Sequence, residues 1–325
     1  MLRLADRWIW DFWIASTSSA YHMFYLQAPR AIGDPALRHQ AATIGHASSS
    51  DLVTWTVLPD ALGPGSPGSW DDLATWTGSV VEHDGTWYML YTGVSSADRG
   101  LIQRIGLATS PDLLAWSKHP ANPVIIADRR WYERFDQTAW REQAWRDPWV
   151  VRVLDRPRFH ALITARVAHG PADGRGVLGH AISEDLVTWD VQPPLSNPGE
   201  FGHLEVPQVE IVDGAPVLVF SIAAADVSQR RRSRGPIATA TYVCAGRSLL
   251  GPFDLAGAQP VSIPHLYSGR LVHRHDGSWV MMAFVNADQD GEFVGEIGDP
   301  HPISDLGMSL FTSSEVSARG LVGWS

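Results

Sequence analysis

Apolar residues in this chain gather in short runs that are separated by polar turns. The runs are rich in Val, Ile, Trp, Tyr and Phe, and Asp-Gly pairs such as Asp84-Gly85 and Asp276-Gly277 lie between some of them. Short runs of β-branched and aromatic residues between turn signals are typical of β-strands. No segment shows the sustained 3.6-residue periodicity of an amphipathic helix. The pattern therefore predicts an all-β protein.

One stretch of the chain recurs at intervals of roughly 65 residues. Residues 44–55 read IGHASSSDLVTW, and the segments at 105–116 and 178–189 read IGLATSPDLLAW and LGHAISEDLVTW. A more divergent copy, TYVCAGRSLLGPF, lies at 241–253. Each copy predicts a hairpin, which consists of a short strand, a polar turn and a strand that ends on Trp or Phe.

Two further strands precede each predicted hairpin. The first strands are expected at 8–15, 75–83, 145–153, 204–212 and 267–273. The second strands are expected at 21–27, 87–93, 159–166, 217–223 and 279–285. Four-stranded antiparallel units repeated around an axis form a β-propeller, so five units predict a five-bladed propeller that spans residues 1–325 as a single domain. Residues 286–325 are expected to complete the fifth blade and to supply a strand that closes the ring. A β-sandwich is the alternative, and the regular order of the repeats disfavours it.

Three of the predicted first strands carry an acid within an otherwise apolar run: Asp11, Asp147 and Glu205. The innermost strands of a propeller line its axis, so these acids are expected to converge. Carboxylates gathered in one place acquire raised and separated pKa values, which acid–base and nucleophilic catalysis requires. We therefore expect a catalytic site. For Asp11 alone, a strand-end residue that caps a turn is the simpler interpretation.

Composition and charge exclude several functional classes. With 45% hydrophobic and 18% charged residues, the 325-residue chain is typical of a globular protein. A net charge of -10 argues against nucleic acid and anionic membranes as partners. The lone Cys244 rules out an intrachain disulfide. The sequence shows no signal peptide and no segment long enough to span a bilayer, so a cytoplasmic location is expected.

The chain contains fifteen tryptophans, which is a high number for its length. Five of them occupy matching repeat positions and are expected to be structural: Trp55, Trp87, Trp116, Trp189 and Trp279. Nine others gather near the first strands of three units. Flat aromatic side chains suit the apolar faces of sugar rings, although they suit a protein core equally well.

Five segments, in order along the chain, resemble motifs of the β-fructofuranosidase superfamily (glycoside hydrolase families 32 and 68, clan J), with family 43 as a near neighbour. These segments are Trp10-Asp11-Phe12-Trp13, the strand at 21–27, Trp76-Thr77-Gly78-Ser79, Trp145-Arg146-Asp147-Pro148 and Leu204-Glu205-Val206-Pro207-Gln208. The fourth carries the Arg-Asp-Pro motif, and the fifth is similar to the Glu-Cys-Pro-Asp segment of invertases. The chain departs from invertases because Asp11 is not followed by Pro-Asn-Gly, and because Val206 and Gln208 replace the Cys and the second acid. There is also no room after the fifth blade for the C-terminal β-sandwich that invertases append.

The resemblance implies a catalytic domain that acts as a retaining β-fructofuranosidase on sucrose or short fructo-oligosaccharides. Asp11 would attack the anomeric carbon, Glu205 would protonate the leaving oxygen and then activate water, and Asp147 would stabilise the oxocarbenium-like transition state. Expected substrate contacts are Trp10, Trp13, Gln27, Trp76, Thr77, Ser79, Arg146, Tyr267 and Arg270. No cofactor and no metal is implied, since His273 and His275 lack a third ligand at a suitable spacing. A small oligosaccharide is the only partner expected, and the oligomeric state is not indicated.

Three other functions are compatible with the same residues. The acids would serve an inverting arabinofuranosidase or xylosidase of the family 43 kind as base, pKa modulator and acid. A fructosyltransferase would share the covalent intermediate with a hydrolase. A sugar-binding propeller without catalysis is the alternative outside enzymes. The basic segment Arg230-Arg231-Arg232-Ser233-Arg234 is interpreted as a solvated loop, with contact to a phosphorylated sugar as the alternative.

The three acids are expected to differ in pKa. Arg146 is adjacent to Asp147 and should keep it ionised well below neutral pH. Glu205 is flanked by apolar residues and would face two negative charges, so its pKa should be raised.

Overall fold

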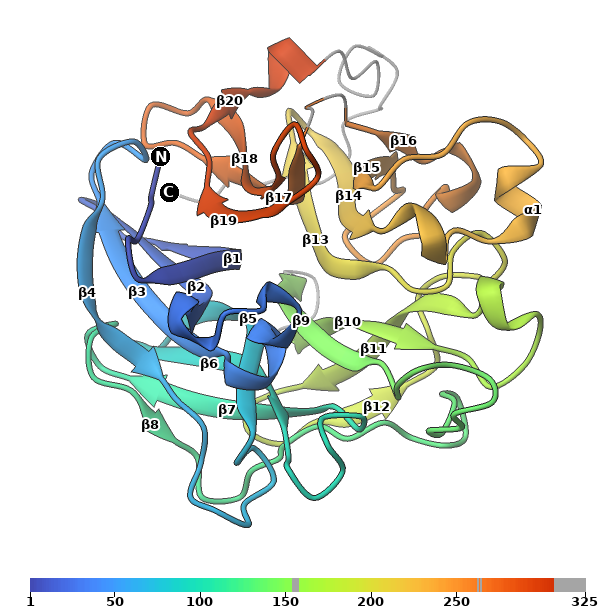
Figure 1. Cartoon of the computed structure of the whole chain (residues 1–325), viewed down its shortest axis with the longest axis horizontal. Helices are drawn as coiled ribbons and strands as arrows, with labels where there is room; N and C mark the ends of the chain where they lie inside the picture. Colours follow the sequence, from blue (N-terminus) through green and yellow to red (C-terminus); the bar gives the residue numbers. More distant parts are fainter. Residues whose placement is uncertain (154–157, 262, 264, 307–325) are drawn as a thin grey trace.

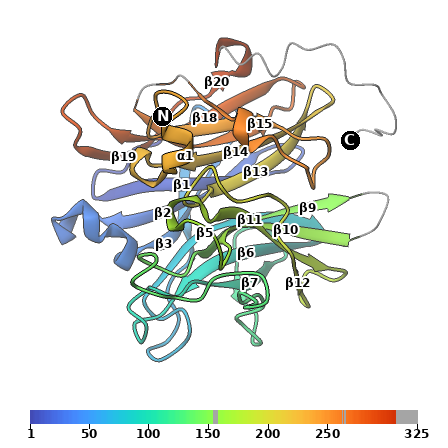
Figure 2. The same ribbon diagram turned by 90° about the vertical axis from the view of Figure 1, so that its right-hand side faces the viewer.

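The computed structural model of this protein describes residues 1–153, 158–261, 263 and 265–306. Within this part of the chain, five antiparallel sheets of four strands each surround a central axis, as the blades of a propeller do (Figure 1). The prediction of an all-β, five-bladed propeller is confirmed. In the side view, blade one (blue) lies between blade five (orange to red) and blade two (cyan), so the first and last blades are neighbours in the ring (Figure 2).

In blades one to four the strands follow one another across the blade from the axis outwards, and in blade five the third and fourth strands both pair with the second. Blade one contains β1 (Arg7–Ser16), β2 (Tyr21–Pro29), β3 (Thr43–Ser49) and β4 (Thr56–Leu62). Blade two contains β5 (Ala74–His83), β6 (Thr86–Val94), β7 (Arg104–Ser110) and β8 (Ser117–Lys118). Blade three contains β9 (Trp145–Val153), β10 (Arg158–Arg166), β11 (Gly176–Ser183) and β12 (Asp190–Gln192). Blade four contains β13 (Glu205–Val212), β14 (Ala215–Ile222), β15 (Ala240–Ala245) and β16 (Gln259–Pro260). Blade five contains β17 (Leu266–His273), β18 (Trp279–Ala287), β19 (Phe293–Ile297) and β20 (His301–Pro302).

Helical segments among the described residues are short, and all except the last, which follows β20, lie on the connections between strands. They are η1 (Arg30–Ile32), η2 (Pro35–Ala41), η3 (Ala172–Gly174), η4 (Ala224–Asp226), α1 (Gln229–Arg232), η5 (Leu255–Gly257) and η6 (Ile303–Leu306). None of these helices has the length and the apolar character that crossing a membrane requires.

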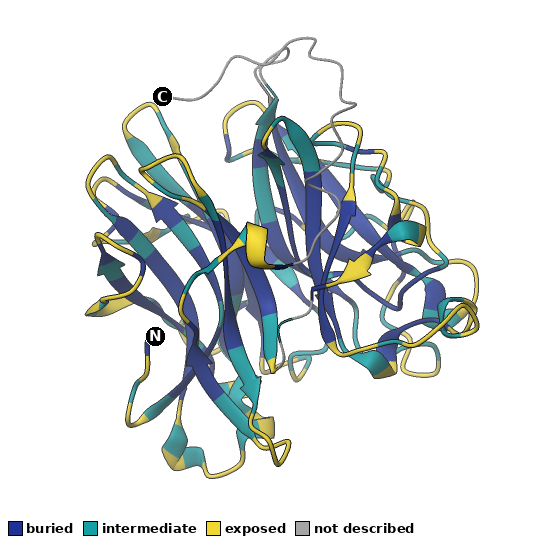
Figure 3. Cartoon of the chain, turned by 90° about the horizontal axis from the view of Figure 1, so that it is seen from above, coloured by how far each residue is buried: buried dark blue, intermediate teal, exposed yellow. Residues whose placement is uncertain are grey.

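The inner strands are apolar on both faces because neighbouring blades cover both sides of each sheet. In β1, the side chains of Trp8, Ile9, Trp10, Phe12 and Trp13 are all at most 6% exposed. Burial on both faces removes the alternation of apolar and polar residues that a half-exposed strand shows. Buried residues follow the middle of the strands, and exposed residues mark the connecting loops (Figure 3).

The recurrent segment forms a hairpin with a specific turn in blades one to three. In blade one, the N–H groups of Val53 and Thr54 donate to Oδ1 of Asp51 at 2.8 and 2.7 Å. The indole N–H of Trp55 donates to the carbonyl of Leu52, which has a φ of +66°. The prediction that Trp ends the outer strand is wrong, since Trp55 completes the turn and β4 begins after it. Equivalent turns are centred on Asp112 and Asp185.

The ring closes between the N-terminal segment and blade five. Leu2 and Ile297 exchange two backbone hydrogen bonds of 2.9 and 3.0 Å, so Leu2 extends the outer edge of β19. The prediction assigned closure to residues 286–325, but the closing contact in the described part of the chain comes from the N-terminal segment. Residues 307–325 of that predicted segment lie outside the described residues.

Candidate active site

A cavity of about 410 Å³ opens where the first halves of the five inner strands converge. Each inner strand contributes to its lining, together with residues from the connections. The lining residues are Trp10, Asp11, Leu26, Arg38, His39, Trp76, Thr77, Arg141, Glu142, Arg146, Asp147, Glu205, Val206, Ala223, Thr239, Tyr267, Phe284 and Asn286. The structure thus brings the three predicted catalytic acids, Asp11, Asp147 and Glu205, into one cavity.

Each inner strand is interrupted by a β-bulge at the cavity. The pairing register shifts between Trp10 and Phe12 in β1, and comparable shifts occur in the pairing of the other four inner strands. Asp11 and Asp147 occupy these bulges with φ values of +28° and +56°. A non-glycine residue rarely adopts a positive φ, and such strained positions concentrate at functional sites. Bulges re-aim side chains, so this backbone directs acids of apolar strands into the cavity.

Asp11 accepts hydrogen bonds from two hydroxyl groups on neighbouring blades. Ser268 of β17 donates to Oδ1 at 2.5 Å, and Thr77 of β5 donates to Oδ2 at 3.5 Å. Burial raises the pKa of Asp11 to about 7, and the negative charges of Asp147 and Glu205 add to the increase. The Ser268 hydroxyl acts in the opposite direction because it stabilises the carboxylate.

Asp147 is almost fully buried and is fixed by neighbours from two blades. Its Oδ2 accepts a hydrogen bond of 2.9 Å from the Thr164 hydroxyl and one of 3.1 Å from the Val206 N–H. Nε of Arg146 lies 3.4 Å from the same oxygen. Burial nevertheless raises the pKa of Asp147, and these partners reduce the increase.

Glu205 lies close to three donor groups from neighbouring residues. Nη2 of Arg146 donates to Oε1 at 3.0 Å, and the Tyr267 hydroxyl donates to Oε2 at 2.5 Å. Nε2 of His203 lies 3.2 Å from Oε1. Burial alone would raise the pKa of Glu205, but His203, Arg146 and Tyr267 together hold it well below its usual range.

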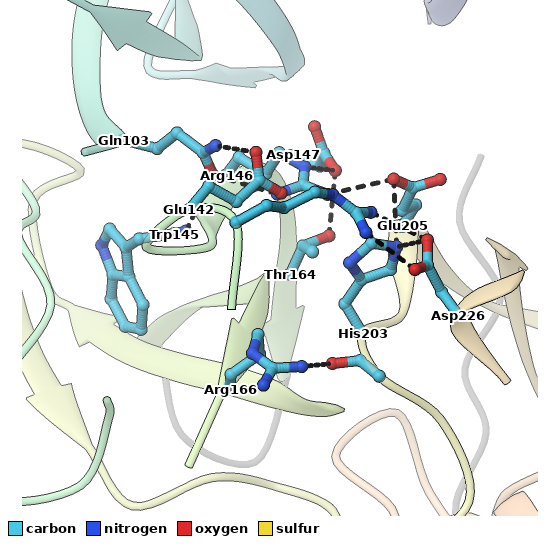
Figure 4. Close-up of polar contacts among 12 residues, drawn as sticks. Gln103, Glu142, Trp145, Arg146, Asp147, Thr164, Arg166, His203, Glu205 and Asp226 are labelled. Carbon is cyan, nitrogen blue, oxygen red and sulfur yellow. Dashed lines mark hydrogen bonds and ion pairs between the residues drawn. The ribbon is translucent and has the colours of Figure 1, made fainter. Parts of the chain in front are cut away.

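The expected directions of the pKa shifts are therefore wrong for Asp147 and Glu205. Arg146 was expected to serve Asp147, its neighbour in sequence, but its guanidinium extends to Glu205 and to Glu142, whose Oε1 it contacts at 2.8 Å (Figure 4). The pKa of Asp147 is raised and that of Glu205 is lowered, the reverse of the prediction. In the free protein, the site favours a proton on Asp11 over one on Glu205.

The structure divides the nine expected substrate contacts into two groups. Trp10, Trp76, Thr77, Arg146 and Tyr267 line the cavity. The other four, Trp13, Gln27, Ser79 and Arg270, do not.

Three residues of the second group are engaged in packing between and within the blades. Trp13 is fully buried and stacks on Phe24. The amide of Gln27 donates to the hydroxyl of Thr43 at 3.2 Å within blade one. Ser79 accepts a 3.2 Å hydrogen bond from a backbone N–H of blade three. These side chains stabilise the scaffold around the cavity.

Arg270 lies beneath the cavity and joins the strands that carry two of the acids. Its Nε donates to the carbonyl of Phe12 at 3.0 Å, and its Nη1 donates to the carbonyls of Val206 and Pro207 at 3.1 and 3.0 Å. Its guanidinium also faces the ring of Trp149 at 5.1 Å. Arg270 therefore holds the bulges next to Asp11 and Glu205 instead of lining the cavity.

Several cavity residues that were not predicted from the sequence lie on connections between strands. Arg38 and His39 reach the cavity from η2, and Arg141 and Glu142 reach it from the loop before β9. The guanidinium of Arg38 lies 5.4 Å from the centre of the Trp10 ring. No repeat or alternating pattern includes these residues, so nothing in the local sequence distinguishes them from ordinary loop residues.

The basic segment at 230–234 is held by contacts within blade four. Arg230 and Arg234 pair with Glu200, the latter at 2.6 Å. Arg231 and Arg232 donate to backbone carbonyls. The arginines are thus occupied in holding the segment together, and none of them lines the cavity. No group of three His, Cys, Asp or Glu residues suited to a metal ion occurs in the described ranges.

Relatives in sequence include plant enzymes that act on fructosides. A fructan 6-exohydrolase from Beta vulgaris is 28% identical over 214 residues, which cover 64% of this chain and 32% of the relative. A β-fructofuranosidase 1 from Zea mays is 33% identical over 215 residues, which cover 63% of this chain and 28% of the relative. The match therefore spans at most about a third of the length of these relatives.

Solved structures share the fold over most of this chain. An inulosucrase from Halalkalicoccus jeotgali bound to kestose superimposes with a TM-score of 0.71 at 21% identity and covers 90% of this chain and 81% of its own. A sucrose-6-phosphate hydrolase from Lactobacillus gasseri gives a TM-score of 0.69 at 18% identity, covering 91% and 60%. Identities this low establish a common fold.

The family assignment comes from a match that covers most of the sequence. The family model for the glycosyl hydrolases family 32 N-terminal domain matches residues 13–290. Asp147 and Glu205 lie within the matched range, and Asp11 lies immediately before it. The resemblance seen in the sequence motifs is confirmed, and the chain belongs to glycosyl hydrolase family 32.

Proposed function

We propose that this protein is a retaining β-fructofuranosidase that hydrolyses sucrose or short fructo-oligosaccharides at the described cavity. The observation that carries the proposal is the convergence of Asp11, Asp147 and Glu205 on one cavity from three separate blades. Bringing three carboxylates together costs electrostatic free energy, and a purely structural role does not require such an arrangement. The names of the relatives, a fructan exohydrolase and β-fructofuranosidases, support a fructoside substrate.

In the first half of the proposed reaction, Asp11 attacks the anomeric carbon of the fructosyl unit. Glu205 donates a proton to the leaving oxygen, and a covalent fructosyl ester forms on Asp11. Asp147 is fixed by Thr164 and the Val206 N–H, so it is suited to hold sugar hydroxyls and to stabilise positive charge on the ring.

In the second half, the Glu205 carboxylate activates a water molecule that releases fructose from Asp11. Glu205 is stabilised as a carboxylate by Arg146 and Tyr267, which suits this base role. For the first half, a proton must reside on Glu205 while Asp11 is ionised, the reverse of the distribution that the free protein favours. The substrate must therefore bind to the minor state in which Glu205 is protonated and Asp11 is ionised, or its binding must shift the proton from Asp11 to Glu205.

Replacement of the nucleophile tests the proposal directly. Asp11→Asn is expected to lower kcat/KM on sucrose by roughly three to five powers of ten, because the covalent route is lost. Asp60→Asn is the matched control, since Asp60 lies on β4, where it pairs with Arg7 outside the cavity. An Asp11→Asn variant that keeps most of its rate would sink the assignment.

The stereochemistry of the first product distinguishes the remaining enzymatic alternatives. A retaining enzyme releases β-fructofuranose first, as ¹H NMR of the early reaction would show, while inversion would support an arabinofuranosidase- or xylosidase-like mechanism. Accumulation of longer fructosides at high sucrose would indicate transfer. Binding of fructosides without turnover on any of them would support a sugar-binding propeller.

A further inference from the structure

A fully buried histidine lies directly behind the proposed acid/base. His203 lies two positions before Glu205, the first residue of β13, and has no exposed surface. Its Nε2 lies 3.2 Å from Oε1 of Glu205 and 3.5 Å from Oδ2 of Asp226 (Figure 4). Neither ring nitrogen has a well-aligned hydrogen bond to the part of the chain that the structure describes. The imidazole therefore sits between two carboxylates, with Nε2 shared between them.

Backbone contacts fix the position of this imidazole. The N–H of Gly202 donates to the carbonyl of Asp226 at 2.7 Å, and Arg166 donates to the carbonyl of Gly202. A Cβ at Gly202 would lie 2.7 Å from the Trp140 ring and 2.8 Å from the Asp226 carbonyl, so only glycine permits this close approach. Trp140 meets the imidazole edge-on, with ring centres 5.9 Å apart. The segment cannot move His203 away from Glu205 without breaking these contacts.

The second carboxylate is itself held in place by an arginine. Nη1 and Nη2 of Arg141 contact the two oxygens of Asp226 at 2.7 and 2.8 Å, and this pair holds the pKa of Asp226 below its usual value despite partial burial. Asp226 is therefore ionised at neutral pH. A carboxylate at Nε2 favours the tautomer that carries its hydrogen on Nε2.

The other charged groups around the imidazole belong to the same network. Glu142, on the loop before β9, interacts with the imidazole electrostatically, whereas Arg146 of β9 and Tyr267 of β17 contact Glu205. Donor groups of Arg146, Tyr267 and His203 thus lie within 3.2 Å of the Glu205 carboxylate on three sides. Only His203 has no exposed surface.

We propose that His203 is a positioning residue for the acid/base: its Nε2–H, oriented by the Arg141–Asp226 pair, holds Oε1 of Glu205 and sets the pH at which Glu205 gains its proton. This inference rests on the proposed role of Glu205. The imidazole touches the acid/base and not the substrate, so it acts through Glu205. It accounts for a buried histidine that the two catalytic steps do not otherwise use.

Substitution of His203 by residues with and without a donor tests the proposal. His203→Leu removes the donor to the Glu205 carboxylate, so the alkaline limb of the kcat profile should move upward by roughly one pH unit. His203→Gln places an amide N–H in the same region and should restore the limb to near its original position. An unmoved limb in His203→Leu, or equal shifts in both variants, would overturn the proposal.

A control and a second readout separate this inference from the proposed function. His46→Leu removes another buried histidine, whose Nδ1 has no hydrogen-bond partner among the described residues and which stacks on Phe24 outside the cavity. It should lower stability without moving the alkaline limb of the kcat profile. The ¹³C signal of the Glu205 side-chain carboxyl, assigned with Glu205→Gln, reports the titration directly. If the unmodified protein does not turn over fructosides, the proposed function fails, yet a His203-dependent shift of this signal would still support the inference and an unchanged midpoint would overturn it.

Discussion

Arg146 contacts three of the acids around the cavity. Its guanidinium contacts Gln103 and Glu142 through Nη1 and Glu205 through Nη2, while only Nε lies near Asp147. Arg146 thus gives aligned hydrogen bonds to Glu142 and Glu205 and a weaker contact to Asp147. Together with His203 and Tyr267 it keeps Glu205 ionised, and the proton of the resting site is held by Asp11.

The hydroxyl of Ser268 provides a test of the Asp11 pKa. The reactive form of the free enzyme holds one proton between Asp11 and Glu205, and the Asp11 pKa of about 7 is the higher of the two, so kcat/KM should fall as the pH rises above about 7. Ser268→Ala removes a donor that stabilises the carboxylate, so the pKa of Asp11 should rise and this alkaline limb of kcat/KM should move to higher pH. Ser18→Ala, in an exposed turn, is the control. An alkaline limb of kcat/KM that stays in place after Ser268→Ala would contradict this account.

The β-bulge is the element that converts an apolar strand into a catalytic one. An undisturbed strand would alternate its side chains between the two covered faces of the blade, where a carboxylate would be costly. The bulge adds a residue and turns the acid towards the axis, as the positive φ of Asp11 and Asp147 shows. Blade two has the same irregularity without an acid, and it presents Thr77 to Asp11.

Gly78 is expected to be essential for the bulge of blade two. A Cβ at Gly78 would lie 2.0 Å from the backbone carbonyl oxygen of Leu90 on β6, and a backbone atom cannot move aside. Gly78→Ala should lower the free energy of unfolding by about 2–3 kcal/mol, measured by urea denaturation. Gly63→Ala is the matched control, since a Cβ there meets nothing within 4 Å, and it should change stability by less than about 0.5 kcal/mol. Equal stability of the two variants would refute the steric explanation.

At the scale of the whole molecule, the propeller depends on a non-covalent contact between its first and last blades. β1 of blade one packs against β17, β18 and β19 of blade five, and Leu2 adds the closing pair of hydrogen bonds. A ring held in this way keeps Asp11 of blade one in contact with Ser268 of blade five. Closure and catalytic geometry are therefore linked.

Truncation of the buried Leu2 side chain tests the importance of closure. Leu2 is 4% exposed, so Leu2→Ala should lower the free energy of unfolding by about 2–3 kcal/mol. The alkaline limb of kcat/KM should shift as well if a loosened ring separates Ser268 from Asp11. Leu37→Ala, at a side chain that is 45% exposed, should change neither quantity appreciably. Unchanged stability in Leu2→Ala would show that the contact does not hold the ring closed.

The sequence by itself determined the fold class, the number of blades and the three candidate acids. Strand periodicity and the Asp51-type turn are local properties, because the turn contacts join residues at most three positions apart. A repeat of such local units specifies a propeller, and a propeller implies that acids on inner strands converge. The order of motifs was sufficient to indicate the family that the match over residues 13–290 confirms.

Only the tertiary structure decided which acid holds the proton and which side chains line the cavity. Arg146 reaches Glu205 across 59 residues of sequence, and Tyr267 reaches it across 62. Electrostatic interactions depend on distance in space, so proximity in sequence misled the expectation that pairs Arg146 with Asp147. Cavity residues such as Arg38 come from connections whose paths no periodic pattern specifies, and the closing role of Leu2 becomes evident only when the first and last blades meet.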